Sequence, residues 1–437
     1  MTSIDTKLNG GLVAEPQYRT MEKWARTALF KALTTLHTGS LTLIEADERN
    51  VFGHPEAAGP HAVIHVHQGA FFTNIAFGGS IGAGESFMEG EWHSPDLVDV
   101  VRLMSLNLDV LDGMEGGWAH LTKPILKVLH AFNKNTRSGS RNNIAAHYDL
   151  GNDFFREFLD PTMMYSAAVF PHAEATLNEA AVHKLDRVCR KLELGPDDHV
   201  VEIGTGWGGF AIHAAKNYGC RVTTTTISQE QHAYAALRIR EEGLQDRIEL
   251  LLKDYRDLDG VYDKLVSIEM IEAVGHHFLG TWFEKCSSLL KPDGLMCIQA
   301  ITMPEDRYDS ALRDVDFIKR YIFPGSFIPS VGAMLDAMGK STDLKMIHME
   351  DHSDHYARTL ALWRRNFHAN REGAVIAALP TRFQRMWDFY LAYCEGGFWE
   401  RVIGSAQLVF AKPRNRRDAV LQELGWGAPA ERPAPRG

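Results

Sequence analysis

The sequence predicts an α/β protein in which a mostly parallel, Rossmann-like sheet follows a smaller N-terminal α+β domain. From residue 144 onward, short apolar runs alternate with helical stretches, a pattern that predicts a parallel sheet covered by helices on both faces. One apolar run, at 199–203, leads directly into a glycine-rich turn and then a helical pattern. The residues before 125 mix helix and strand patterns without this regular alternation.

Length and composition set the scale of the domains. The chain has 437 residues, enough for one large or two medium domains, and its 45% hydrophobic and 23% charged residues are ordinary for a globular protein with a core. The net charge of −10 argues against general nucleic-acid binding, which requires a basic surface. We expect an N-terminal domain over 1–125, a linker over 126–143, an α/β domain over 144–412 and a disordered tail over 413–437.

The cysteines and the apolar runs bear on the compartment. The five cysteines are dispersed and form no C-x-x-C pair, which indicates a reduced, cytosolic protein. The first residues lack the apolar core of a signal peptide. No apolar run approaches the ~20 residues that span a bilayer. We therefore expect a cytoplasmic protein whose contact with a membrane is peripheral.

The N-terminal domain opens with a helix and two strands. Apolar residues at helical spacing predict an amphipathic helix over 18–36. Residues 40–44 and 61–67 read as strands, and a loop is expected over 56–60. The domain has no evident catalytic set, so a structural or dimerisation role is the simplest interpretation.

A glycine-punctuated turn followed by a short amphipathic piece is predicted over 78–92, and a helix is predicted over 97–111. Ser94 is the expected N-cap of that helix, and Pro95 fits its first position because proline needs no partner for a backbone N–H there.

Three histidines, His61, His65 and His67, occur in the second predicted strand. On one strand His65 and His67 share a face, which makes a metal site conceivable. No carboxylate or cysteine accompanies them, so a solvated strand face is the favoured interpretation.

The segment 133–143 is polar and basic, which is typical of an inter-domain linker. Lys134, Arg137 and Arg141 could meet anionic lipid headgroups, each contributing about 1 kcal/mol near a membrane surface. A merely solvated linker explains the same residues.

The α/β domain is expected to place its ligand at one edge of the sheet. In doubly wound sheets, ligands bind beyond the carboxyl ends of the strands, so the residues just after each strand are the candidates for chemistry. The predicted strands are 199–203, 221–226, 247–251, 264–269 and 294–301.

The glycine-rich turn is the strongest local signal. Gly204, Gly206 and Gly209 satisfy a dinucleotide fingerprint, but the next strand lacks the acidic residue that would hold the ribose of NAD or FAD. Glu202 precedes the first glycine instead. The pattern Glu-x-Gly-x-Gly-x-Gly looks like the S-adenosylmethionine (SAM) loop of class I methyltransferases, in which Glu202 would orient the loop or meet the charged end of the ligand. A nicotinamide or flavin site is the alternative.

Further blocks resemble one family. Residues 144–155, with His147-Tyr148-Asp149 and Gly151-Asn152-Asp153, resemble the HYD-x-GND-x-F signature of cyclopropane-fatty-acyl-phospholipid synthases and the related mycolic-acid methyltransferases. The resemblance covers about 135–412, and the N-terminal module is similar to the N-terminal domain of that family. The other matching blocks are 164–166, 202–208, 226–231, 269–275 and 321–325.

The resemblance implies a class I methyltransferase fold and transfer of the SAM methyl group to a cis double bond in a phospholipid acyl chain, which forms a cyclopropane fatty acid. It also implies a set of SAM contacts, with Asp254 and Tyr255 beside the adenine. The other implied contacts are Tyr165, Ser166, Glu202, Gly204, Thr205, Gly206, Trp207, Gly208, Thr226, Ile227, Ser228 and Gln231.

The family's chemistry requires a carbocation to be stabilised and a proton to be removed. By resemblance, a bicarbonate ion serves as the base and is held by Glu272, Tyr356 and the backbone of Ile301, while Cys394 matches a cysteine regarded as active. Aromatic faces can stabilise a carbocation. The aromatic candidates are Tyr148, Tyr165, Phe170, Trp207, Tyr321, Phe323 and Tyr356. Core packing is the alternative for each of them, as it is for Cys394.

Two departures concern the base site. The family's Tyr-Ser-Cys-Ala block reads with Ala167 in place of the cysteine, and Gln299 stands where the family has a histidine. Gln299 can still donate hydrogen bonds to an anion, whereas the side chain of Ala167 cannot. A carboxylate at Glu272 would repel a bound anion unless one of the two is protonated.

The main hypothesis is therefore a SAM-dependent cyclopropane-forming enzyme that acts on unsaturated phospholipid at the inner face of the membrane, with a homodimer implied by resemblance only. The first alternative methylates the same chain without ring closure and leaves a methyl-branched lipid. The second alternative is a non-catalytic protein that binds lipid or SAM.

Overall fold

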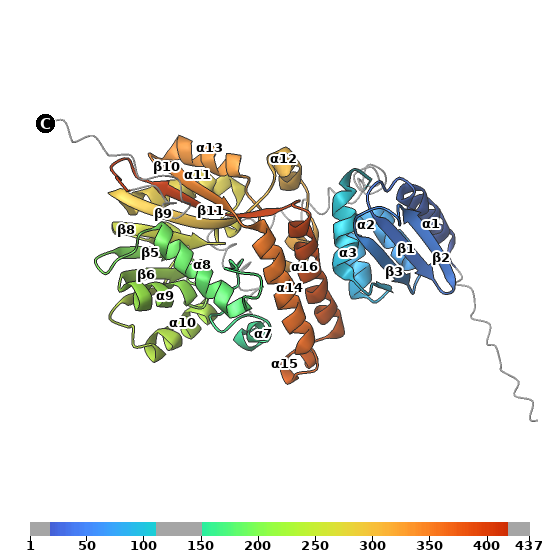
Figure 1. Cartoon of the computed structure of the whole chain (residues 1–437), viewed down its shortest axis with the longest axis horizontal. Helices are drawn as coiled ribbons and strands as arrows, with labels where there is room; N and C mark the ends of the chain where they lie inside the picture. The colour runs from blue at the N-terminus through green and yellow to red at the C-terminus, as the bar shows by residue number, and fades with distance from the viewer. Residues whose placement is uncertain (1–17, 111–150, 418–437) are drawn as a thin grey trace, which may run out of the picture. The chain divides into compact units, whose positions relative to one another are not determined.

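The computed structural model describes residues 18–110 and 151–417 and divides into two compact units (Figure 1). The first unit joins the residues up to Asn133 to the segments Ser310–Pro324 and Ala357–Ile403. The second unit contains the remainder, including Gly325–Tyr356. The division into contiguous domains stays a prediction, and the expected linker with Lys134, Arg137 and Arg141 lies outside the described residues.

Over residues 18–110, the first unit forms a four-stranded sheet with three helices. The strand order is β2-β1-β3-β4, in which β1 pairs antiparallel with β2 and parallel with β3, and β3 pairs antiparallel with β4. The predicted helix and both predicted strands are present, and β2 and β4 are additional strands. The elements are α1 (Thr20–Leu33), β1 (Ser40–Glu45), β2 (Glu48–Gly53), β3 (His61–Val66), α2 (Ala70–Met88), β4 (Trp92–His93) and α3 (Leu97–Leu106).

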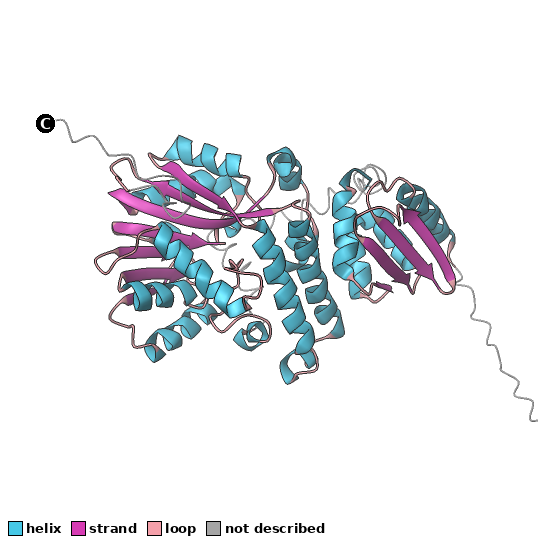
Figure 2. Ribbon diagram, in the orientation of Figure 1, coloured by secondary structure: helices cyan, strands magenta, loops and turns pink. Residues whose placement is uncertain are grey.

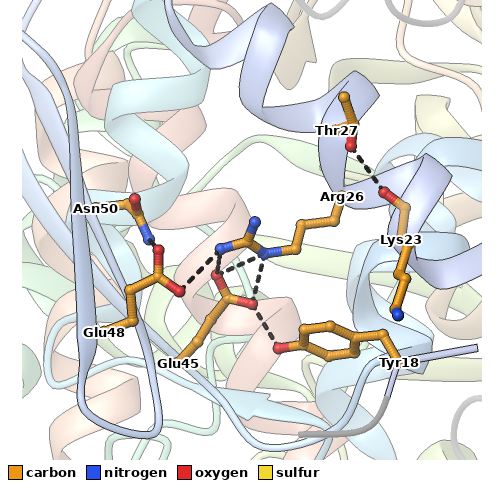
Figure 3. A network of polar contacts seen from close by, with 7 residues as sticks. All are labelled: Tyr18, Lys23, Arg26, Thr27, Glu45, Glu48 and Asn50. Carbon is orange, nitrogen blue, oxygen red and sulfur yellow. Dashed lines mark hydrogen bonds and ion pairs between the residues drawn. The ribbon is translucent and has the colours of Figure 1, made fainter. Parts of the chain in front are cut away.

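A polar network ties α1 to the hairpin of β1 and β2 (Figure 3). The carboxylate of Glu45, only 3% exposed, accepts hydrogen bonds from Tyr18 Oη at 2.5 Å and Arg26 Nε at 2.9 Å. Arg26 also reaches Glu48 at 3.3 Å. A buried carboxylate requires such partners, so this network fixes the start of the chain's first helix on the sheet.

The turn predicted over 78–92 is wrong. The segment forms the long helix α2, and only Gly79, with φ 53° and ψ −133°, interrupts it with a kink. Gly84 serves close packing instead, since a Cβ at this position would lie 2.4 Å from the Phe317 ring. Local glycine content favours a turn, but the space between α2 and its neighbours decides the structure.

The predicted cap of α3 is also displaced. Asp96, rather than Ser94, is the N-cap, because its side chain accepts from the backbone N–H groups of Val98 and Asp99. Pro95 therefore precedes the helix. The helix ends at Leu106, before the predicted end at 111, where Asn107 turns its amide to the carbonyl oxygens of Leu103 and Thr38.

The histidines of β3 lie on a stacked face. The rings of His65 and His67 both stack on His93 of β4, with centroids 4.6 and 4.8 Å apart. His67 Nε2 and His93 Nδ1 are 2.7 Å apart, so these rings bond to each other. Within residues 18–110 and 151–417, no three metal-ligating side chains are arranged to hold an ion.

The second unit contains a seven-stranded sheet with the order β10-β11-β9-β8-β5-β6-β7 (Figure 2). All pairs from β9 to β7 are parallel, whereas β11 runs antiparallel to both β9 and β10. The mostly parallel sheet is thus confirmed, and β10 and β11 are strands that the sequence analysis does not predict. The strands are β5 (His199–Ile203), β6 (Arg221–Thr226), β7 (Ile248–Leu252), β8 (Tyr262–Ile268), β9 (Leu290–Thr302), β10 (Lys345–Asp351) and β11 (Gly404–Ala411).

α-Helices connect most successive strands of this sheet, as the alternating pattern predicts, whereas only the short turn η2 lies between β7 and β8. The buried residues of α8 and α9 pack with those of β5, β6 and β9 into one apolar cluster that contains Val200, Phe210 and Cys297. The helices are α7 (Asn152–Arg156), α8 (Leu177–Lys191), α9 (Gly209–Tyr218), α10 (Gln229–Glu241), α11 (Leu279–Ser288) and α13 (Val331–Ser341), with the short 3₁₀ turns η2 (Tyr255–Asp257), η3 (Ile271–Ala273) and η4 (His276–Phe278).

The C-terminal half also supplies helices to the first unit. Arg385 of α16 donates hydrogen bonds to the carbonyl oxygens of Phe87 and Trp92, and Arg102 of α3 pairs with Glu400. No helix among those described combines the length and apolar character needed to cross a membrane. The remaining helices are α12 (Glu305–Arg313), η5 (Ile318–Ile322), α14 (Ser353–Ala369), α15 (Ala374–Ala377) and α16 (Thr381–Trp399).

Candidate functional site

The glycine loop joins the carboxyl end of β5 to the first turn of α9. Gly204 has φ 105° and Gly206 has φ 53°, which side chains rarely adopt, so glycine is required at both positions. A Cβ on Gly206 would meet no protein atom within 4 Å. The loop therefore exposes bare backbone next to the N-terminus of α9, as a nucleotide-like ligand requires.

Glu202 lies behind this loop. It is 3% exposed, and its Oε2 accepts a hydrogen bond from Thr224 Oγ1 at 2.6 Å. Thr224 Oγ1 is also 2.7 Å from Thr205 Oγ1 in the loop. Burial raises the pKa of Glu202 to about 8, against the effect of the Thr224 hydrogen bond. These contacts favour the first of the two predicted roles, in which Glu202 orients the loop.

The end of β6 provides a second wall. Thr226 Oγ1 donates to Gln231 Oε1 at 2.9 Å, and Ser228 caps α10 by accepting from the backbone N–H of Gln231. Ile227 lies between these residues in the turn that joins β6 to α10. The predicted block 226–231 is thus one hydrogen-bonded unit at the same sheet edge as the glycine loop.

The residues that follow β7 form a third wall. Asp254 caps η2, and Arg256 binds its carboxylate with Nε at 2.8 Å and Nη2 at 2.7 Å. The aspartate charge is therefore neutralised by the protein. Burial raises the pKa of the neighbouring Tyr255 to about 12, so its hydroxyl stays protonated.

Aromatic residues and a buried lysine complete the surroundings of the loop. Trp207 donates from Nε1 to Asn152 Oδ1 at 2.6 Å, and its ring centroid lies 5.0 Å from that of Phe155. Phe155 in turn packs edge-on against Tyr165 at 5.3 Å. Lys184, which is fully buried, donates to Ser166 Oγ at 2.8 Å. The sequence analysis missed Lys184, although a lysine within the apolar face of α8 was a signal.

The charge of Lys184 is balanced by carboxylates. Burial lowers the pKa of Lys184 to about 8, and the negative charges of Glu269, Asp160 and Glu202 oppose that effect. The lysine therefore connects the loop glutamate, Glu202, electrostatically to Glu269 at the end of β8.

Glu269 is the centre of the polar contacts near the end of β8, and the sequence analysis gave it no role. Its Oε1 accepts from the backbone N–H of Ala167 at 2.9 Å and from Gln299 Nε2 at 2.8 Å, and its Oε2 accepts from Tyr356 Oη at 2.8 Å. Its φ of 47° is unusual for a residue with a side chain and indicates a position held by its surroundings. Burial raises its pKa, while these hydrogen bonds and Lys184 act in the opposite direction.

Glu272 follows in η3 with a different environment. Its Oε1 accepts from the backbone N–H of Ile301 at 2.6 Å, which brings together two of the predicted residues. Its Oε2 is buried and has no hydrogen-bond partner among the described residues. Burial, and then the negative charge of Glu269, raise the pKa of Glu272 to about 8. A carboxylate with a free oxygen and such a pKa has the properties of a general base near neutral pH.

The predicted bicarbonate site does not match these contacts. The donors assigned to the ion are already bonded to the protein's carboxylates, Ile301 to Glu272 and both Tyr356 and Gln299 to Glu269. Ala167 offers only its backbone N–H, which Glu269 also takes. When it is ionised, Glu269, which these donors surround, would also repel a second anion. The residues present therefore do not fit bicarbonate.

The remaining predicted residues take no part in these hydrogen bonds among the described residues. Cys394 belongs to the first unit, on α16, and burial raises the pKa of its thiol well above the ordinary value, which suits a packed residue better than a nucleophile. Tyr321, hydrogen-bonded to Glu85, and Phe323 also belong to the first unit. Phe170 packs on His355 in the second unit. Tyr148 lies outside the described residues.

A family model decides the classification. The model for mycolic acid cyclopropane synthetase matches residues 135–408, which include every predicted site residue. The chain belongs to this mycolic acid cyclopropane synthetase family. It is therefore a SAM-dependent methyltransferase of the class I fold, and the expectation from the glycine loop is confirmed at that level.

The chain is similar in sequence to several curated proteins. It is 39% identical over 351 residues to tuberculostearic acid methyltransferase UfaA1 of Mycobacterium tuberculosis, which covers 78% of this chain and 82% of the relative. It is 36% identical over 360 residues to the cyclopropane-fatty-acyl-phospholipid synthase of Escherichia coli, covering 80% and 88%.

A solved structure of the mycolic acid cyclopropane synthetase family has a bound nucleoside. The mycolic acid cyclopropane synthase CmaA1, crystallised with SAH and CTAB, superposes with a TM-score of 0.59 and 30% identity, covering 62% of this chain and 98% of that protein. SAH is what remains of SAM after the methyl group has left, so this likeness supports SAM as the methyl donor.

Proposed function

We propose that this protein transfers the methyl group of SAM to a cis double bond in an unsaturated phospholipid acyl chain, and that loss of a proton then closes a cyclopropane ring. The observation that carries the proposal is the buried Oε2 of Glu272, which has no hydrogen-bond partner within residues 18–110 and 151–417 and follows β8 at the same sheet edge as the glycine loop. The E. coli relative, named a cyclopropane-fatty-acyl-phospholipid synthase, supports the substrate class.

The proposed reaction needs both a held donor and a base. SAM, when bound, supplies an electrophilic methyl group on a sulfonium. The alkene electron pair forms the new C–C bond as the C–S bond breaks, which leaves a cation on the second alkene carbon. Glu272 takes a proton from the new methyl group, and the electrons of that C–H bond close the ring.

The chain's own residues orient these steps. The 204–208 loop allows close approach of the donor, and Glu202, Thr224 and Thr205 hold the loop in place. The negative charges of Glu269 and Glu272 stabilise the developing cation, which counts for more in a buried site than in water. Tyr356 keeps Glu269 in position.

We assign the base to Glu272 itself rather than to bicarbonate, because the described donors expected to hold the ion, Ile301, Tyr356 and Gln299, already bond to Glu272 or Glu269. Turnover should therefore be the same in carbonate-depleted buffer and in buffer with added bicarbonate. A clear stimulation by added bicarbonate would show that the ion takes part and that the contacts at Ile301 rearrange around it.

A second candidate function is methylation without ring closure, which leaves a methyl-branched lipid. Ala167 and Gln299 favour it, because this chain lacks the cysteine and histidine of the resembling family. A relative at 39% identity is named a methyltransferase rather than a synthase of cyclopropanes. In this case the proton leaves from a different carbon.

The proposal places the substrate in a membrane, so the first test uses vesicles. Purified protein is incubated with SAM carrying a labelled methyl group and with vesicles of either cis-monounsaturated or fully saturated phosphatidylglycerol. Label should enter only the unsaturated lipid. Equal labelling of both lipids, or labelling of the headgroup alone, would contradict a reaction at the double bond. The homodimer implied by resemblance stays a prediction.

A further inference from the structure

A chain of buried polar side chains crosses β9 and β11 and ends at Glu269. Lys191 Nζ donates to Gln407 Oε1 at 2.6 Å, Gln407 Nε2 donates to Gln299 Oε1 at 3.0 Å, and Gln299 Nε2 donates to Glu269 Oε1 at 2.8 Å. Gln407 and Gln299 are direct partners in the strand register. Lys191, the most accessible of the three residues that lead to Glu269, is 5% exposed. No water is needed to connect them.

The direction of these hydrogen bonds is fixed from both ends. An ammonium group only donates, so the atom of Gln407 that meets Lys191 must be the amide oxygen. The amide NH₂ of Gln407 then faces Gln299, whose oxygen accepts, and the NH₂ of Gln299 is left to face Glu269. At the other end, Gln299 Nε2 also donates to the carbonyl oxygen of Ala167 at 3.1 Å, and a carbonyl can only accept.

The lysine at the start of this series of hydrogen bonds is also paired with a carboxylate. Its Nζ lies 2.5 Å from Glu350 Oε2, and Arg187 binds the other oxygen of the same carboxylate. Burial would raise the pKa of Glu350, but the hydrogen bonds from Arg187 and Lys191 lower it to about 2. Glu350 is thus the counter-ion of the Lys191 ammonium, and this ammonium donates to Gln407, as the direction of the amides requires.

The direction matters at Glu269, which receives three donors and offers no proton. Its carboxylate accepts from Gln299, the Ala167 N–H and Tyr356, and Lys184 is the cation that faces it. The negative charge of Glu269 in turn raises the pKa of Glu272. We infer that Lys191 and Gln407 are positioning residues, which hold Gln299 as a donor to Glu269 and so keep Glu269 ionised beside Glu272. This inference rests on the proposed function, because it takes Glu272 as the base.

A substitution that keeps the side-chain shape can reverse the direction of the hydrogen bond between Gln299 and residue 407. In Gln407→Glu, the new carboxylate still accepts from Lys191 but has no N–H for Gln299. Gln299 then turns its oxygen toward Glu269, and a carboxylate that faces an amide oxygen and loses a donor takes up a proton. A neutral Glu269 no longer raises the pKa of Glu272. The acid limb of kcat/KM for lipid methylation should therefore move to lower pH by about one unit, with a lower plateau because the base is weaker.

The control is Ser405→Ala on the same strand. Ser405 is fully buried and lies two residues from Gln407. Its hydroxyl bonds to His352 Nε2 at 3.1 Å and takes no part in the hydrogen bonds from Lys191 to Glu269. A variant that merely loosens β11 lowers the rate at every pH and leaves the acid limb in place, which is the result expected for Ser405→Ala. If Gln407→Glu does not fold, Lys191→Gln is the second variant. It replaces the ammonium, which only donates, by an amide, and the acid limb of kcat/KM should move to lower pH by a smaller amount than in Gln407→Glu.

A second readout needs no turnover. Infrared spectra of Gln407→Glu should gain a protonated-carboxyl band, and the double variant with Glu269→Gln should lose it. An acid limb that coincides with that of the wild type, or a band that survives Glu269→Gln, would overturn the inference. Absence of wild-type turnover on any vesicle would instead refute the proposed function, while the infrared band still tests the direction of the chain.

Discussion

Glu269 and Glu272 lie three positions apart after β8, yet their surroundings give them different chemistry. Glu269 accepts three hydrogen bonds, whereas Glu272 has a buried oxygen without any partner among the described residues. When the surroundings of two carboxylates differ in this way, their pKa values differ, and the two groups can take distinct acid–base roles. The base assignment belongs to Glu272 for that reason.

Glu272→Gln tests this assignment directly. The amide keeps the shape of the side chain but cannot take a proton, so turnover should fall by about 10²–10⁴-fold. SAM affinity, measured by calorimetry on the same sample, should stay within a factor of a few. A parallel loss of SAM binding would show that Glu272 holds the donor instead of acting on the substrate.

The pH profile of the wild type belongs to the same prediction. Glu272 acts only when ionised, and burial together with Glu269 raises its pKa to about 8. The rate should therefore rise with pH through the neutral range and level off above about 8. A profile that is already flat from pH 6 would contradict a base with a raised pKa.

Lys184 is the residue whose loss should disturb most groups at once. Lys184→Met keeps the apolar stem but leaves Glu202, Glu269 and Asp160 without their buried cation. The free energy of unfolding should drop by about 3–5 kcal/mol in denaturant titrations. Lys216→Met is the control, because its ammonium pairs with Glu242 at the surface and should cost at most about 1 kcal/mol. Equal losses in both variants would contradict the buried role.

At the scale of elements, the turn between β5 and α9 is where backbone geometry serves a ligand. Gly206→Ala puts a methyl group at φ 53° into the space that the loop leaves open. SAM affinity should fall by at least about tenfold, beyond a strain cost of about 1–2 kcal/mol. Gly243→Ala, after α10, carries a similar strain at φ 68° with no neighbour within 4 Å, and SAM affinity should not change. If both variants changed SAM affinity equally, the open space at Gly206 would not be the binding site for SAM.

The packing of α2 offers a second matched pair. Gly84→Ala forces a Cβ to 2.4 Å from the Phe317 ring, and the overpacking should destabilise the protein by about 1–3 kcal/mol in thermal unfolding. Gly78→Ala in the same helix meets no atom within 4 Å and should be neutral or stabilising by about 0.5–1 kcal/mol. The reverse order would show that Gly84 is not a packing residue.

For the whole molecule, the sequence was most informative where local pattern and tertiary structure agree. The parallel strands from β5 to β9 follow from apolar runs between helices, and the loop at 204–208 follows from glycine spacing. β10 was missed because it is an edge strand with a bulge between Met346 and His348, which breaks its alternation. β11 was missed as a strand that runs against the parallel pattern.

The site was predicted less completely than the fold, because its contacts depend on partners far apart in the chain. Ile301 and Glu272 were expected to share one site, and the structure joins them by a hydrogen bond. Tyr356 and Gln299 bond to Glu269 instead, which no local motif indicates. Lys184 and Gln407 read as ordinary helix and strand positions until their buried partners are known. At 78–92 the local sequence misled the prediction. The glycines favour a turn, but packing around α2 produces a helix.

The identity of the product tests the central claim most directly. Purified protein is incubated with SAM and cis-monounsaturated phospholipid vesicles, and the released acyl chains are examined by proton NMR. A cyclopropane and a methyl-branched alkene have the same mass, but the methylene protons of a cyclopropane are unusually shielded and its formation removes the alkene signal. We expect the shielded signal from the wild type and no such signal from Glu272→Gln. A retained alkene that carries a new methyl group would contradict ring closure by Glu272.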